Sequence, residues 1–144
     1  MYLKKNLLIS LGILILVLHV FVINSAVAES ITTGLNVMAE AEDVLAIPGN
    51  KLPIYLVVSI TNLFGQPIAK LNISNFEIST LIAAPGGSSL IDTTRVIETK
   101  TDGTYLVYII PNQQETWKKG VYIFTISVIK DKIKGQSLVN VFVD

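Results

Sequence analysis

The feature that most constrains this chain is an alternation of its side chains at a period of two, which recurs in separate stretches. The residues that this period places on one face of each stretch are Ile54, Leu56, Val58, Ile60; Tyr105, Val107, Ile109; Tyr122, Phe124, Ile126, Val128; and Val139, Val141, Val143. A period of two is typical of a half-buried β-strand, whereas a helix repeats every 3.6 residues. The chain is therefore predicted to be built mainly from strands.

Turn signals separate these stretches. Runs rich in Gly, Pro and Asn, which suit tight turns, occur at residues 48–51, 62–67 and 84–89, and a further turn is expected at residues 131–135, which begin with Asp and end with Gly. A further strand is expected at residues 75–82, one strand or two short ones at residues 90–99, and a first strand within residues 35–47. Strands punctuated by turns every 8–12 residues predict an antiparallel sandwich of about seven strands.

The phrase Gly-x-Tyr occurs twice, at residues 103–105 and 120–122. In each copy the Gly allows the chain to bend into a strand, and the Tyr falls one step inside it. A tyrosine at this place buries its ring and can reach a backbone group with its hydroxyl, as in the tyrosine corner of β-sandwiches. The repeat therefore predicts two strand starts rather than a chemical motif.

Residues 1–28 have the pattern of a signal peptide. Lys4 and Lys5 precede an apolar run over residues 7–23, and Ala26-Val27-Ala28 resembles a small-residue cleavage site before Glu29. The alternative is an uncleaved membrane anchor formed by residues 7–23, because this run is close to the length that spans a bilayer. We expect an exported protein, in the periplasm, at the cell surface or outside the cell, with the anchored form as the alternative.

Cleavage would leave 116 residues, which suits one domain. We expect a lead-in over residues 29–43 and the sandwich over residues 44–144. This part has nine basic and eleven acidic residues, a net charge of −2, which argues against a nucleic-acid partner or an anionic membrane surface. The chain has no cysteine, so the core alone must hold the fold.

A resemblance to a known family follows from three segments: SITNLFGQPIAKLNISNFEI, DGTYLVYIIP and WKKGVYIFTISV. Their order of turns and strands resembles bacterial immunoglobulin-like domains of the invasin-like and macroglobulin-like kind. The resemblance implies an all-β, immunoglobulin-like antiparallel β-sandwich, here preceded by an N-terminal signal helix. It also implies a spacer or binding module of surface and envelope proteins, although this chain carries one copy of a unit that often occurs in tandem.

The inventory of reactive residues argues against an enzyme. The only histidine, His19, lies in the signal segment, so the remaining chain has no Ser-His, Cys-His or His-metal arrangement. Paired carboxylates could still perform acid-base chemistry or bind calcium, but no acidic residue shows a motif spacing. We expect no catalytic residues, no metal site and no cofactor.

One stretch is a candidate recognition site: Trp117 beside Lys118 and Lys119, in the connection between the two Gly-x-Tyr strands. An exposed Trp next to basic residues can stack on a sugar or anchor a partner, while a buried one would cap the end of the core.

We therefore expect a non-enzymatic module that mediates protein-protein interaction, cell adhesion or assembly in the cell envelope, with another envelope or surface protein as its partner. The alternative is a carbohydrate-binding module that uses Trp117 and neighbouring tyrosines. A membrane is expected as a partner only if the N-terminal segment stays uncleaved.

Overall fold

The computed structural model describes residues 34–42, 46–112 and 114–144, and these residues belong to one compact unit, Gly34–Asp144. The expected signal helix and anchor lie outside the described residues. No helix long and apolar enough to cross a bilayer occurs in the described ranges.

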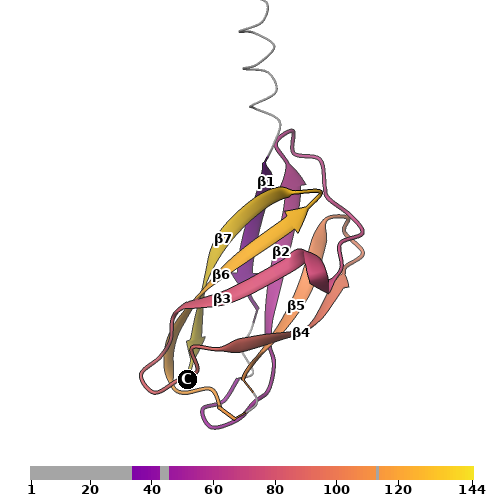
Figure 1. The fold of residues 1–144 in the computed structure, drawn as a ribbon. Helices are drawn as coiled ribbons and strands as arrows, with labels where there is room; N and C mark the ends of the chain where they lie inside the picture. The colour runs from indigo at the N-terminus through magenta and orange to yellow at the C-terminus, as the bar shows by residue number, and fades with distance from the viewer. Residues whose placement is uncertain (1–33, 43–45, 113) are drawn as a thin grey trace, which may run out of the picture. The chain divides into compact units, whose positions relative to one another are not determined.

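The described unit is all-β, with seven strands in two antiparallel sheets and one short 3-10 turn, η1 (Ile73–Asn75). The strands are β1 (Leu35–Ala41), β2 (Ile54–Asn62), β3 (Phe76–Ile82), β4 (Ile91–Glu98), β5 (Thr104–Pro111), β6 (Gly120–Lys130) and β7 (Ile133–Val143). One sheet has the order β1-β2-β5-β4 and the other the order β3-β6-β7. In Figure 1 the three-stranded sheet lies in front of the four-stranded one. The predicted antiparallel sandwich of seven strands is confirmed.

The core lies between the two sheets, and the period-two pattern supplies it. The residues that the alternation places on one face of β2, β5, β6 and β7 are all buried, with exposed fractions of 0–4%. Their neighbours along each strand are intermediate or exposed, except Ser127 on β6, which is 5% exposed. The sequence pattern therefore identified the inward face of these four strands correctly.

The structure gives exact bounds for two strands that the sequence located only loosely. The first strand, β1, lies within residues 35–47, where a first strand was expected, and it ends at Ala41. Residues 90–99 form a single strand, β4, whose pairing with β5 shifts register between Thr93 and Arg95. This irregularity explains the weak alternation of that segment, because an inserted residue moves later side chains to the other face.

Candidate interaction surfaces

Trp117, the centre of the expected recognition site, is fully buried, with 0% of its side chain exposed. Its indole N–H donates a hydrogen bond to the Leu52 carbonyl oxygen at 2.8 Å. Its ring packs edge-on against Tyr122 and Phe124, at centroid distances of 5.3 and 6.3 Å. Trp117 therefore caps one end of the core, and it offers no ring face on which a sugar could stack.

Lys118 and Lys119 are exposed, so the structure does not bring them together with the Trp117 ring. The connection that carries all three residues is fixed by its backbone. The Trp117 N–H donates to the Asn50 carbonyl at 3.0 Å, and the Gly49 N–H donates to the Trp117 carbonyl at 2.8 Å. The connection is thus docked on the turn that precedes β2.

Both tyrosines of the Gly-x-Tyr repeat are buried, and each hydroxyl reaches backbone, as the sequence predicted. The Tyr122 hydroxyl accepts a hydrogen bond from the Lys118 N–H at 2.9 Å. The Tyr105 hydroxyl donates to the Ile68 carbonyl at 2.7 Å and accepts from the Leu71 N–H at 3.2 Å. The repeat is therefore architectural: each tyrosine ties a strand to a neighbouring loop.

Among the described residues, the carboxylate of Glu98 makes the most hydrogen bonds, and it lies beside the Tyr105 hydroxyl. It accepts hydrogen bonds from the backbone N–H groups of Lys70 at 3.0 Å and Gly103 at 3.4 Å, and lies 3.2 Å from the Tyr105 hydroxyl. The bond from Lys70 is the main cause that lowers the pKa of Glu98, against a smaller opposing effect of desolvation. Burial raises the pKa of Tyr105. This cluster holds a loop in place, because its polar groups point at backbone.

Within the loop at residues 84–89, which the sequence marks as a turn, Gly87 and Ser88 pack against the protein. Gly87 lies so close to the Tyr122 hydroxyl that a Cβ there would overlap it. The Gly87 N–H donates to the Ala84 carbonyl at 2.8 Å, and Ser88 is 1% exposed. The loop therefore needs a glycine for close packing.

The outer surface of the three-stranded sheet carries large apolar side chains that sequence reasoning missed. Cross-strand pairing places Val121 beside Phe142, and Ile123 beside both Ile82 and Asn140. Leu138 lies on the same side of the sheet, opposite Thr125. We call Ile82, Val121, Ile123, Leu138 and Phe142 the apolar face.

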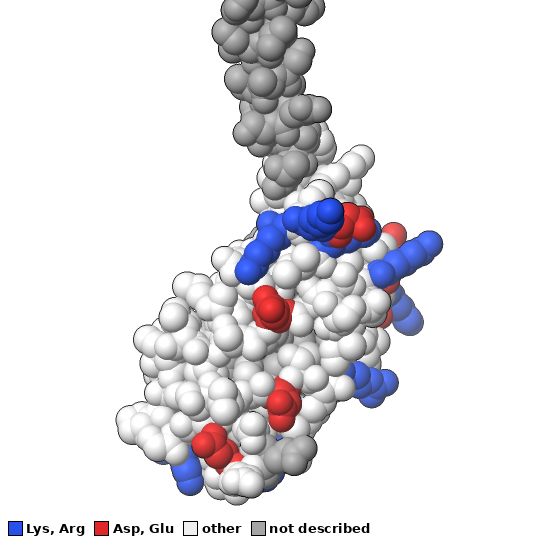
Figure 2. Space-filling model, viewed as in Figure 1, with Lys and Arg blue, Asp and Glu red and all other residues white. Residues whose placement is uncertain are grey.

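Four members of the apolar face have large exposed fractions: Ile82 50%, Val121 39%, Leu138 57% and Phe142 64%. Figure 2 shows this side of the molecule, where Lys and Arg side chains gather mainly at one end, single Asp and Glu side chains lie farther along, and most of the visible surface is uncharged. Part of the signal for this face was the run VYIFTISV, in which Val121 and Ile123 are apolar although they alternate with the inward Tyr122 and Phe124.

The outer surface of the four-stranded sheet carries an aromatic pair. Tyr55 and Tyr108 are opposite one another on β2 and β5, with ring centroids 4.8 Å apart and planes at 81°. The Arg95 guanidinium lies 5.7 Å from the Tyr108 ring centroid, in cation-π range. The two rings are edge-on to one another, so they do not form a coplanar aromatic platform.

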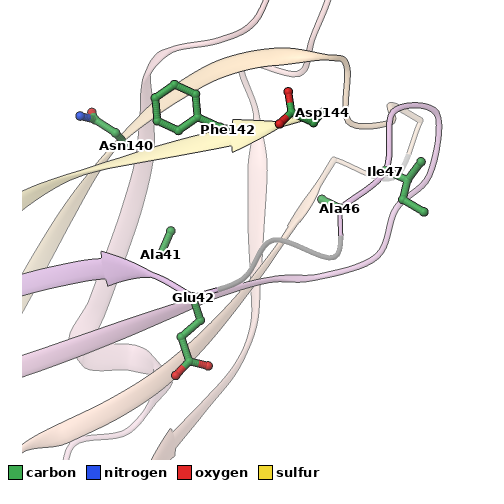
Figure 3. A pocket seen from close by; sticks show the side chains of 7 residues that line it. All are labelled: Ala41, Glu42, Ala46, Ile47, Asn140, Phe142 and Asp144. Carbon is green, nitrogen blue, oxygen red and sulfur yellow. The ribbon is translucent and has the colours of Figure 1, made fainter.

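A hollow of about 400 Å³ lies between the ends of β1 and β7. It is lined by Ala41, Glu42, Ala46, Ile47, Asn140, Phe142 and Asp144. Figure 3 shows β1 and β7 running in the same direction on either side of it, with the Ala41 methyl toward β7 and the Glu42 carboxylate pointing away. Among the residues that the structure describes, no three His, Cys, Asp or Glu side chains lie close enough to share a metal ion.

Comparisons of the chain with protein-family models, with curated proteins and with solved structures give no match.

Proposed function

We propose that the chain is an exported, non-enzymatic, immunoglobulin-like module that binds another protein of the cell envelope or cell surface through the apolar face. Its role is interaction or assembly rather than chemistry. A membrane is a partner only if the N-terminal segment is retained as an anchor.

The strand order supports the immunoglobulin-like part of this proposal. Constant-type immunoglobulin domains place strands A, B, E and D in one sheet and C, F and G in the other. The orders β1-β2-β5-β4 and β3-β6-β7 correspond to these strand for strand. The bond from the Lys118 N–H to the Tyr122 hydroxyl at the start of β6 is the counterpart of the tyrosine corner on strand F.

The observation that carries the binding role is the exposure of the apolar face. Contiguous exposed apolar surface is costly in water, and on soluble domains it marks sites that are covered by a partner. Phe142 is 64% exposed although its strand neighbours Val141 and Val143 are each 1% exposed. The sheet could have carried polar residues at these positions without loss of core packing, so their apolar character favours a partner.

The chemistry of the apolar face also favours a protein over other partners. Its five members have no charge, and the chain beyond the signal segment has a net charge of −2. Nucleic acids and anionic membranes are bound through clustered Lys and Arg. A flat, uncharged surface of aliphatic and aromatic side chains matches the buried centre of a protein interface.

The test is site-specific photo-crosslinking of the full chain in the cells that make it. A photoreactive amino acid replaces Val121 on the apolar face, and the matched control replaces Asp92, which is exposed on the other sheet. We expect an adduct of this chain with a different protein from position 121 and none from position 92. An adduct only between two copies, equal adducts from both positions, or no adduct from a folded protein would contradict the proposal.

Export is tested separately, by the intact mass of the protein purified from the same cells. A mass that begins at Glu29 supports a cleaved signal. A full-length mass in the membrane fraction supports the anchored alternative, and a full-length mass in the cytoplasmic fraction would contradict export.

A further inference from the structure

One segment of the chain matches the acceptor signal for N-linked glycosylation. Asn72-Ile73-Ser74 reads Asn-x-Ser with a middle residue other than proline, and no other asparagine of the chain is followed by Ser or Thr two positions later. In exported proteins this spacing is read by enzymes that attach a sugar to the asparagine amide at the protein surface. Because the signal is short, the local structure decides whether Asn72 can serve as an acceptor.

The acceptor segment lies on the surface, at the turn that leads into β3. Asn72, Ile73 and Ser74 are all exposed, and Ile73 has an exposed fraction of 44%. On either side of them, Leu71 and Phe76 are buried and hold the turn to the core. An enzyme can therefore reach all three residues of the signal without opening the fold.

The side-chain amide of Asn72 has a fixed orientation. Its oxygen, Oδ1, accepts hydrogen bonds from the Ser74 N–H at 2.9 Å and from the Ser74 hydroxyl at 2.6 Å. A backbone N–H only donates, so the atom that it meets has to be the amide oxygen and not the nitrogen. The two groups that the signal specifies, the asparagine amide and the hydroxyl two residues later, are thus side by side in the folded chain.

The amide nitrogen of Asn72, Nδ2, takes no part in the bonding of the turn. It has no hydrogen-bond partner among the described residues, whereas in the same turn the Asn75 Nδ2 donates to the Ile129 carbonyl oxygen at 2.8 Å. A sugar on Nδ2 replaces one of its two hydrogens and leaves Oδ1 unchanged. The bond from the Asn72 N–H to the Asn75 Oδ1, at 2.9 Å, is also unaffected. Glycosylation of Asn72 therefore breaks no hydrogen bond within the described part of the fold.

We propose that Asn72 is an N-glycosylation site, and that the sugar donor is an oligosaccharide carried on a polyisoprenyl diphosphate. In the transfer, Nδ2 forms a bond to C1 of the first sugar, and the bond from C1 to the diphosphate oxygen breaks. The lipid diphosphate leaves with the electron pair, and the proton that Nδ2 loses goes to a base of the transferring enzyme. The reaction changes no oxidation state and needs no further reactant.

The position of Asn72 keeps the sugar away from the apolar face. Asn72 lies just before β3, whereas Ile82, a member of the apolar face, is the last residue of that strand. The strand has seven residues, so its ends are about 20 Å apart. Val121 and Phe142 also lie toward the Ile82 end, because Ile82 is opposite Ile123 on β6. A glycan at Asn72 thus extends from the other end of the sheet and leaves the apolar face open to a partner.

The inference rests on the export that is part of the proposed function, because N-linked sugars are added to exported chains. It does not depend on the apolar face. It also holds for the cleaved and the anchored form alike, since both place Asn72 outside the cytoplasm.

The test is mass spectrometry of the full chain purified from the cells that make it. Trypsin cuts after Lys70 and Arg95, so residues 71–95 form a single fragment that contains the acceptor. We expect this fragment to carry the added mass of one or more sugars, and fragmentation to locate that mass at Asn72.

Three variants separate Asn72 from the serines and threonines of the same fragment. Asn72→Asp keeps an oxygen that accepts both bonds from Ser74, and Asp suits the position before a helical turn, but it has no amide nitrogen. Ser74→Ala keeps the amide and lacks the hydroxyl. We expect both variants to lose the sugar mass completely, whereas Ser74→Thr keeps the signal and should retain it.

The outcomes distinguish this inference from the proposed function. An unmodified fragment from a chain whose mass begins at Glu29, or from a full-length chain in the membrane fraction, would overturn the inference and leave export and the adduct at position 121 intact. A sugar that persists in Asn72→Asp would also overturn it, because the sugar would then be attached to a hydroxyl. An unmodified full-length chain in the cytoplasmic fraction would overturn both the inference and export.

Discussion

The indole N–H of Trp117 donates a hydrogen bond to the carbonyl oxygen of Leu52 across 65 residues of sequence, at 2.8 Å. This bond joins the connection before β6 to the turn before β2, and the ring above it fills the end of the core together with Tyr122. Trp117, which the sequence suggested as a recognition residue, therefore connects two loops by a hydrogen bond.

Trp117→Phe should therefore destabilise the protein. The substitution keeps an aromatic ring but leaves the Leu52 carbonyl without its partner, which costs about 1–3 kcal/mol. We expect a lower urea midpoint with an unchanged slope. The fluorescence of the unmodified protein should be blue-shifted and protected from iodide. Red-shifted emission that iodide quenches freely would contradict the buried position.

Glu98 should make stability depend on pH in the acid range. Its pKa is lower in the folded state than in the unfolded chain, so the unfolded state binds more protons between the two values. The stabilisation is present above the unfolded pKa, about 4.3, and is lost as pH falls through the lower folded value. Urea midpoints from pH 7 to pH 2.5 should therefore fall less steeply for Glu98→Gln than for the original chain. Parallel profiles for the two proteins would be inconsistent with this role.

Thr80 offers a substitution that should stabilise the fold. Within the described residues its Oγ1 is buried without a hydrogen-bond partner, and the residue lies opposite Phe124 on the inward side of β3. Thr80→Val keeps the shape and removes the unsatisfied hydroxyl, which should add about 1 kcal/mol to the free energy of unfolding. Thr80→Ser, which keeps the hydroxyl and loses a methyl group, is the control and should destabilise. A less stable valine variant would show that the hydroxyl has a partner.

A glycine in the turn between β6 and β7 should also stabilise the fold. Lys132 has φ of 68°, a conformation that costs a non-glycine residue roughly 1 kcal/mol. Lys132→Gly gives the Asp-Gly pair that type I′ turns favour, and we expect it to raise the free energy of unfolding by up to about 1 kcal/mol. Gly103→Ala should act in the opposite direction, because φ there is 72° and a Cβ would lie 2.8 Å from the Ile60 carbonyl oxygen. In thermal unfolding, the midpoint temperature should rise for Lys132→Gly and fall for Gly103→Ala.

Much of the fold could be predicted from local pattern. The alternation in residues 54–60 is typical of a half-buried strand. Gly103 precedes β5 and Gly120 begins β6, and both have positive φ. Local pattern also predicted that the side chains of Tyr105 and Tyr122 face inward, and both are buried.

The remaining features depend on partners that lie far away in the sequence. Whether Trp117 points in or out is decided by the turn at residues 49–52, and nothing near Trp117 specifies that turn. The Tyr55–Tyr108 pair exists only because β2 pairs with β5, a choice that alternation does not encode. The apolar face needs both the sheet order and the register of β6 with β7, so it could not be located before the strands were assembled.

The close approach of Gly135 to Leu35 has a mechanical consequence. β1 and β7 run side by side in the same direction, so Gly34 and Asp144 lie at opposite ends of the sandwich (Figure 1). A tension applied between these two residues is directed along the strands. Under this tension β1 must slide along β2, and all seven of its paired positions with β2 must break at once. A force across the sheet would instead open the hydrogen bonds one after another. The unit is thus oriented to carry load along its length.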